Sequence, residues 1–202
     1  MAAAAQVNFD NLPPGVAPPN WTRAHAVGGA VHMQVNRDPT APSGRNVVGQ
    51  RASGPRSAGF PLLYDKVVCR DGEVSVKFKI APSGTDQTAG VVFRYQDPGN
   101  YYLLHFSVDQ KSIHLVRMMN GQKESLALAG RDPGAGLHRD LRANQWYVAK
   151  VIFRGPRLQV LFGNRRLFEV QDSLLQGSGK AGVWTKGETD ASFDDFRIDK
   201  KS

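Results

Sequence analysis

Five polar and aromatic side chains are candidates for binding a ligand: Arg94, Tyr101, His105, Trp184 and Lys186. Strand-like alternation of the stretches that contain them would place all five on one face of a β-sheet. An aromatic ring packs against the apolar face of a pyranose ring, while arginine, lysine and histidine donate hydrogen bonds to hydroxyl or carboxylate groups. The combination therefore suits the binding of a sugar.

Short alternating stretches supply the strands that would carry these residues. In residues 73–80 apolar side chains alternate with polar ones, as expected of a half-buried strand. No window of a dozen residues repeats apolar side chains with helical spacing, so the chain is predicted to be all-β. Further strands are predicted at residues 90–95, 101–108, 112–119, 146–153, 157–162, 165–170, 180–185 and 191–198.

The same alternation assigns a face to each strand residue. Within residues 90–95 the odd-numbered positions, Tyr95 among them, share one face, which leaves Arg94 on the other face. Within residues 101–108 the even-numbered positions form the more apolar face, so the odd-numbered positions are expected to be the open ones. In the last part of the chain Val183 is expected to point inward.

Turn signals separate the strands. Many short strands joined by turns predict an antiparallel β-sandwich of two sheets. Two stretches rich in glycine and arginine, residues 36–61 and 132–143, are predicted to be long loops, the first with a brief strand at Val47 and Val48. The turns, including three dipeptides suited to tight hairpins, are predicted at residues 71–72, 97–100, 120–121 and 163–164.

Four groups of residues resemble the concanavalin A-like (LamG-like) jelly-roll family. They are the run AGVVFRYQDPGNYY at 89–102, Trp146 at the start of a strand, GVWTK at 182–186 and FDDF at 193–196. The chain is most similar to the 3-keto-disaccharide hydrolase-like domains of that family, also called family 16 glycoside hydrolase-like. The resemblance covers nearly the whole chain. It implies two stacked antiparallel sheets, one of them concave, with sugars as the usual ligands.

The resemblance also suggests a structural metal. Jelly rolls of this kind often hold Ca²⁺ at a sheet edge with carboxylates and backbone carbonyls. The N-terminal strand near Phe9 would pair with the C-terminal strand at residues 193–198. Asp10, Asp194 and Asp195 are therefore candidate calcium ligands. The alternative is that these aspartates are exposed residues at strand ends.

Signatures of catalysis are few. The chain has 14 Asp but only 4 Glu, and the glutamates fall on separate strands or turns. Glycoside hydrolysis usually needs two carboxylates about 5–10 Å apart. His105 and His114, on strands expected to be neighbours, could supply a base, although a histidine in a sheet is more often structural. Residues 177–182 match the GxGxxG pattern by letter, but no βαβ unit surrounds them.

Composition limits the classes of partner. The 202 residues include 26 Lys+Arg and 18 Asp+Glu, a net charge of +8, with 41% hydrophobic residues and one cysteine. Such a chain can bury a full core, has no stretch long enough to span a membrane, and cannot form an internal disulfide. The charge favours an acidic glycan. Because the basic residues are dispersed and no nucleic-acid-binding motif accompanies them, no nucleic acid partner is expected.

The first residues, MAAAAQ, suggest where the protein works. Small residues of this kind surround signal cleavage sites, although a charged start and a long apolar run are absent. We expect residues 1–6 to be a disordered remnant and residues 7–199 to form one domain of a secreted or periplasmic monomer. The alternative is an ordinary cytoplasmic terminus.

Two functions remain open from the sequence. The first is non-catalytic carbohydrate binding on the concave face. The second is glycoside hydrolysis of a 3-keto-disaccharide or related glycan, with His105 or a nearby aspartate as the base. The absence of paired glutamates favours the first.

Overall fold

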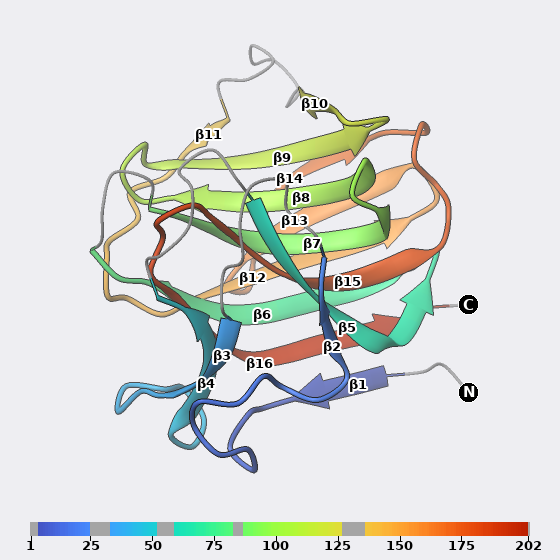
Figure 1. Cartoon of the computed structure of the whole chain (residues 1–202). Coiled ribbons are helices and arrows are strands. Elements are labelled where there is room, and N and C mark those ends of the chain that lie inside the picture. The colour runs from blue at the N-terminus through green and yellow to red at the C-terminus, as the bar shows by residue number, and fades with distance from the viewer. Residues whose placement is uncertain (1–3, 25–32, 52–58, 83–86, 127–135, 202) are drawn as a thin grey trace.

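The computed structural model shows an all-β molecule, as the alternating stretches predict. The structure describes residues 4–24, 33–51, 59–82, 87–126 and 136–201, and these contain strands, turns and no helix. The strands form two antiparallel sheets that lie face to face (Figure 1). The predicted two-sheet sandwich is confirmed. Within the described residues, no helix could span a membrane.

One sheet, here called sheet 1, has the C-terminal strand near its centre. Its other members pair on either side of that strand, and the N-terminal strand pairs with it as well. In spatial order sheet 1 contains β14 (Arg165–Gln171), β13 (Arg157–Phe162), β12 (Tyr147–Arg154), β6 (Gly72–Ile80), β16 (Ala191–Lys200), β4 (Asn46–Gln50) and β3 (Met33–Arg37), with β1 (Ala4–Val7) beside β16.

The other sheet, sheet 2, carries the residues predicted to bind a ligand. Two of its hairpins, β7 to β8 and β8 to β9, follow one another in the chain, and β15 joins them from the C-terminal part. In spatial order sheet 2 contains β10 (Gln122–Ser125), β9 (Ser112–Met119), β8 (Asn100–Ser107), β7 (Thr88–Asp97), β15 (Gly179–Lys186), β5 (Gly59–Cys69) and β2 (Trp21–Arg23), with β11 (Leu137–His138) beside β9.

Apolar side chains from both sheets meet in one shared core. The alternation in β6 gives a buried residue at every second position, as expected for a strand with one face on the core. The rings of Phe78 in sheet 1 and Phe106 in sheet 2 lie 4.6 Å apart between centroids, and those of Phe93 and Phe153 lie 5.2 Å apart. These aromatic contacts join the two layers.

Nine strands lie where alternation predicts them, and the strand around Val47 and Val48 is β4. Alternation misses β2, β3, β5, β10 and β11, and of these β3 and β5 fall at the edges of the segment predicted to be a long loop. Of the three dipeptides expected to form hairpins, those at 120–121 and 163–164 do so. The one at 71–72 does not, because β5 and β6 belong to different sheets.

The N-terminus is more ordered than predicted. Residues 4–6, expected to be disordered, belong to β1, and Ala4 pairs with Asp199 while Val7 pairs with Phe196. Residues 1–3 lie outside the described part. The expected pairing of the first strand with the last is therefore confirmed, with the strand starting a few residues before Phe9.

Candidate functional site

Four of the five predicted ligand-binding residues share the outer face of sheet 2. Trp184 lies directly opposite Gly90, Gly90 lies opposite His105, and His105 lies opposite His114. We call the row of Trp184, Gly90, His105 and His114, which crosses β15, β7, β8 and β9, the histidine row. Tyr101 and Lys186 are on the same face because each stands an even number of residues from a member of the row on its own strand.

Arg94 is on the opposite face, so its predicted place beside Trp184 is wrong. The register of β7 shifts after Phe93, and Arg94 has a positive φ of 46°, which marks a β-bulge. The bulge turns the fully buried Arg94 side chain toward the core, where its guanidinium lies 5.5 Å from the centre of the Phe153 ring. Tyr95 is turned outward instead and stacks on Tyr101.

The outer face of sheet 2 is covered rather than open. Tyr101 and His105 are each only 9% exposed and Trp184 is 8% exposed. Tyr101 and Trp184 belong to a second cluster of buried apolar residues, separate from the core. Its members are Leu63, Val92, Tyr95, Tyr101, Leu103, Val116 and Trp184. The expectation that this face is open is therefore wrong at these residues, since an apolar surface of this kind is more stable when covered.

Two glycines determine the space around the histidine row. Gly90 lies between Trp184 and His105, whose rings approach to 6.0 Å between centroids across it. Gly59, on the neighbouring strand β5, lies under the indole, because a Cβ there would fall 2.5 Å from Trp184 Nε1. At the other end the His105 and His114 rings stack 4.9 Å apart. The row is therefore a continuous band of flat, polar-edged rings.

Two ring nitrogens of the row are buried without a hydrogen-bond partner. They are Nδ1 of His105 and Nε1 of Trp184. Each such group costs about 1–3 kcal/mol of free energy, because it has lost its hydrogen bonds to water and gained none. The His114 ring is different, since its Nε2 lies 3.0 Å from the Ser112 hydroxyl. A ligand with hydroxyl groups could satisfy the two free nitrogens.

The charges nearest the row are positive. The pKa of His105 is lowered to about 3, mainly by burial and to a smaller extent by His114, Lys123 and Lys186. Burial and Lys123 likewise lower the pKa of His114. Both imidazoles are therefore neutral at pH 7. Lys123 was not predicted from the sequence, although the hairpin turn at 120–121 sets a register in which Lys123 faces outward opposite Met118.

The described part of the site provides no carboxylate pair of the kind that hydrolysis would need. Among the described residues, the rings of His105 and His114 contact each other, Trp184 and Ser112, and none of these partners is a carboxylate. The buried acid Asp172 lies on the core side of sheet 2, where it accepts hydrogen bonds from Arg117 and from the Tyr102 hydroxyl. That network holds the sandwich together at one end.

The three aspartates predicted to bind calcium already have protein partners. Asp194 accepts hydrogen bonds from the amide and hydroxyl of Ser43, and Asp195 accepts one from the same hydroxyl at 2.9 Å. Lys77 forms an ion pair with Asp195 at 2.7 Å. Asp10 instead accepts the backbone amides of residues 45 and 46. No group of three acidic, histidine or cysteine side chains suited to a metal occurs in the described ranges.

We expect chelation to leave the stability of the protein unchanged. The hydrogen bonds from Ser43 and the ion pair with Lys77 occupy the carboxylates that calcium would require. Thermal melting in the presence of EDTA and in the presence of excess CaCl₂ measures this directly. A midpoint that falls with EDTA and returns with Ca²⁺ would restore calcium as a structural ligand.

Comparison with known proteins supports the fold. No family model matches the chain, and no curated protein sequence matches it. Among solved structures, the carbohydrate-binding module CBM66 from Bacillus subtilis matches with a TM-score of 0.65 and 18% identity, covering 88% of this chain and 94% of the module. The fold is the concanavalin A-like jelly roll.

Two enzyme structures share this fold with the chain. A β-glucanase from Bacillus licheniformis matches with a TM-score of 0.61 and 10% identity, covering 98% of each chain. A GH43 protein, BlXynB, from the same species matches with a TM-score of 0.61 and 13% identity, covering 97% of this chain and 39% of that protein. The same jelly roll thus occurs in a binding module and in enzymes, so function must come from the site itself.

Proposed function

We propose that the protein binds carbohydrate without cleaving it and that the histidine row, which is buried in this structure, is the centre of a binding site that the ligand must open. The observation that carries this proposal is the pair of buried, unpartnered nitrogens, His105 Nδ1 and Trp184 Nε1. Sugar hydroxyls can both donate and accept hydrogen bonds. They can therefore accept from the indole N–H and can pair with an imidazole nitrogen whether it is protonated or not. Aromatic rings beside them provide the apolar surface that a pyranose needs.

Charge favours an acidic glycan as the ligand. The ionisable groups that act on His105 are His114, Lys123 and Lys186, and none of them is an acid. The whole chain carries a net charge of +8, which attracts anionic polymers over longer distances. Glycans of this kind occur outside cells, so the proposal includes a secreted or periplasmic, monomeric protein.

Hydrolysis is the second candidate, supported by the occurrence of this fold in the β-glucanase and by the histidine pair. The depressed pKa of His105, about 3, argues against it because an imidazole of that basicity is a weak general base. Among the described residues, no carboxylate contacts either histidine ring, where it could act as nucleophile or acid.

A single substitution tests the site. Trp184→Phe keeps an aromatic ring but removes the Nε1–H donor, and we expect about tenfold weaker glycan binding, the upper range for one net hydrogen bond. Trp21→Phe is the matched control, because Trp21 lies in β2 among core aromatic rings and not in the row. Affinities are measured by calorimetry on glycans selected from an array of neutral and uronate oligosaccharides.

The same experiment separates the two functions. Incubation of the bound glycan with the protein, followed by an assay for new reducing ends, should give no product. Release of reducing ends would support the hydrolase. Equal affinities of the Trp184→Phe and Trp21→Phe proteins would show that the ligand does not contact the histidine row.

A further inference from the structure

A polar groove lies on the outer face of sheet 1, on the opposite side of the sandwich from the histidine row. It has a volume of about 190 Å³. That is smaller than the roughly 300–1,000 Å³ of common small-molecule pockets, and it suits one unit of a longer chain. We call it the sheet 1 groove. It is lined by Arg37, Asp38, Pro39, Arg51, Lys79, Ala81, Asn144, Asp190 and Ser192.

Two residues that line the groove, Lys79 and Ser192, belong to a row of paired residues that crosses four strands of sheet 1. Lys79 on β6 lies opposite Ser192 on β16, Ser192 lies opposite Gly49 on β4, and Gly49 lies opposite Gln34 on β3. The middle of this row therefore has almost no side-chain bulk. Gly49 cannot be larger, because a Cβ there would fall 2.5 Å from the backbone oxygen of Ala191. The close packing of β4 against β16 therefore keeps this part of the row small.

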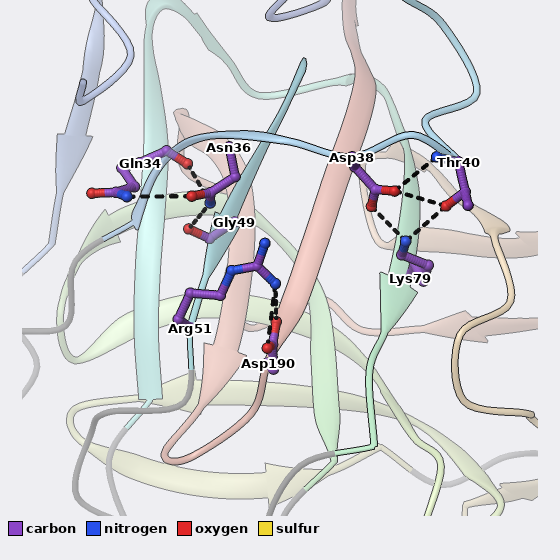
Figure 2. Close-up of polar contacts among 8 residues, drawn as sticks. All are labelled: Gln34, Asn36, Asp38, Thr40, Gly49, Arg51, Lys79 and Asp190. Carbon is purple, nitrogen blue, oxygen red and sulfur yellow. Dashed lines mark hydrogen bonds and ion pairs between the residues drawn. The ribbon is translucent and has the colours of Figure 1, made fainter. Parts of the chain in front are cut away.

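One wall of the groove is held in place by a network around Lys79. Its ammonium group contacts Asp38 at 2.5 Å and donates a hydrogen bond to the Thr40 hydroxyl at 2.8 Å (Figure 2). Asp38 also accepts hydrogen bonds from the Thr40 amide and hydroxyl. Burial alone would raise the pKa of Asp38, but the hydrogen bonds from Lys79 and Thr40 outweigh it and lower the pKa. This wall is ordered before any ligand binds.

The groups that face solvent in the groove are mainly cationic. Arg51 forms an ion pair with Asp190 across the other wall, with the Arg51 side chain 58% exposed and the Asp190 side chain 22% exposed (Figure 2). Asp38 is 9% exposed, whereas Arg37 is well exposed. The acids are thus largely covered and the guanidinium groups are accessible. Guanidinium groups bind carboxylates and sulfates through two parallel hydrogen bonds.

An aromatic ring adjoins this cationic groove. The Trp146 Nε1–H donates to the Thr40 hydroxyl at 3.2 Å, and Lys79 lies 5.2 Å from the centre of the indole. Both contacts fix the half-buried ring at the end of the groove formed by Lys79 and Thr40. A fixed aromatic surface can contact the apolar ring face of an acidic sugar, and the accessible guanidinium groups beside it can bind the anionic group of that sugar.

We infer that the sheet 1 groove is a second ligand site, which binds a saccharide bearing a carboxylate or sulfate group. It is independent of the histidine row, because the two sites lie on the outer faces of different sheets. Arg37 and Arg51 would bind the anionic group, and Trp146 would contact the sugar ring. With two such sites, one protein could attach to two segments of a long acidic glycan.

Binding of a defined oligogalacturonate, measured by calorimetry, tests this inference. Arg51→Gln should weaken binding at the groove about tenfold, since one charge-assisted contact is lost. Arg165→Gln is the matched control, because it removes the same charge from an exposed position on β14, away from the groove. Trp146→Leu should also weaken oligogalacturonate binding. All variants are checked by thermal melting, and the same measurements in Trp184→Phe protein, in which binding at the histidine row is weakened, help to separate the two sites.

Three results would overturn the inference. Equal losses for Arg51→Gln and Arg165→Gln would mean that only net charge matters. A single-stranded oligonucleotide that binds as tightly and responds equally to Arg51→Gln and Trp146→Leu would mean that the groove is not a saccharide site. Loss of all binding in Trp184→Phe protein would place the ligand on the histidine row, which would leave the proposed function standing and remove the second site.

Discussion

Substitution of Arg94 by alanine is expected to lower the free energy of unfolding by about 3–5 kcal/mol, as for other broken buried charge networks. The fully buried guanidinium donates hydrogen bonds to the backbone oxygens of Arg70, Gly155 and Leu175 at 2.7, 2.8 and 3.2 Å. It also donates to Asp71 Oδ1 at 3.2 Å. Without Arg94 these oxygens would lose their donor, and Asp71 would lose its cation.

The effect arises because Arg94 connects segments that are distant in the chain. Its partners belong to the turn between β5 and β6, the turn between β12 and β13, and the segment before β15. Asp71 reinforces the connection by accepting the Gly155 amide at 2.7 Å. One side chain therefore fixes one end of the sandwich, where the two sheets exchange strands.

Urea denaturation of the wild type and of three variants, Arg94→Ala, Arg94→Lys and Arg154→Ala, measures this effect. Arg94→Lys keeps the charge but has no planar fork of donors, so it should recover only part of the lost stability. Arg154→Ala removes an exposed arginine from the same region and should change the free energy of unfolding by less than 0.5 kcal/mol, as is usual for surface substitutions. A loss below about 1 kcal/mol for Arg94→Ala would contradict the structural role.

The error over Arg94 shows what alternation can predict. In β8 no bulge occurs, so the two faces follow directly from the sequence, and Tyr101 and His105 are outward as expected. In β7 the same rule fails after Phe93, because Arg94, with its positive φ, forms a bulge. The residues after the bulge lie on the opposite face from the one that alternation predicts. Arginine has no special preference for that backbone conformation, so the bulge leaves no signal in the sequence.

The missed strands have a similar explanation. β5 contains Pro61, which removes a hydrogen-bond donor, and it lies in a segment rich in glycine and proline. β3 has only five residues and pairs at the edge of sheet 1. In both cases the pairing with a distant strand stabilises a segment whose own sequence indicates a loop. Local propensity is a weak guide under those conditions.

Features that depend on packing could not be predicted from the sequence. The sequence assigns most candidate residues to a face of sheet 2. It does not show that this face is covered, because burial depends on residues elsewhere in the chain. The sheet 1 groove also depends on long-range pairing, since Lys79 and Ser192, which line it, come from strands distant in sequence. The fold was predictable because the alternation recurs over nine strands, whereas each site depends on a few contacts between distant segments.

Acid is expected to destabilise the protein through His105. The pKa of this buried histidine is lowered to about 3, whereas an unfolded chain has the ordinary value of 6.5. Below pH 6.5 the unfolded state therefore binds a proton that the folded state does not, so stability falls as pH falls toward the folded pKa. Between pH 6 and pH 4.5 this single group should reduce the free energy of unfolding by about 2 kcal/mol.

Replacement of the histidine isolates its contribution. His105→Gln cannot take up a proton in this range, so its free energy of unfolding should depend less steeply on pH, by nearly one proton in slope. His138→Gln, at an exposed position on β11, should retain the wild-type dependence. Urea denaturation at pH 7, 6, 5 and 4.5 provides the curves. Identical slopes for wild type and His105→Gln would mean that His105 can accept a proton in the folded protein, which would reopen its role as a general base and with it the hydrolase alternative.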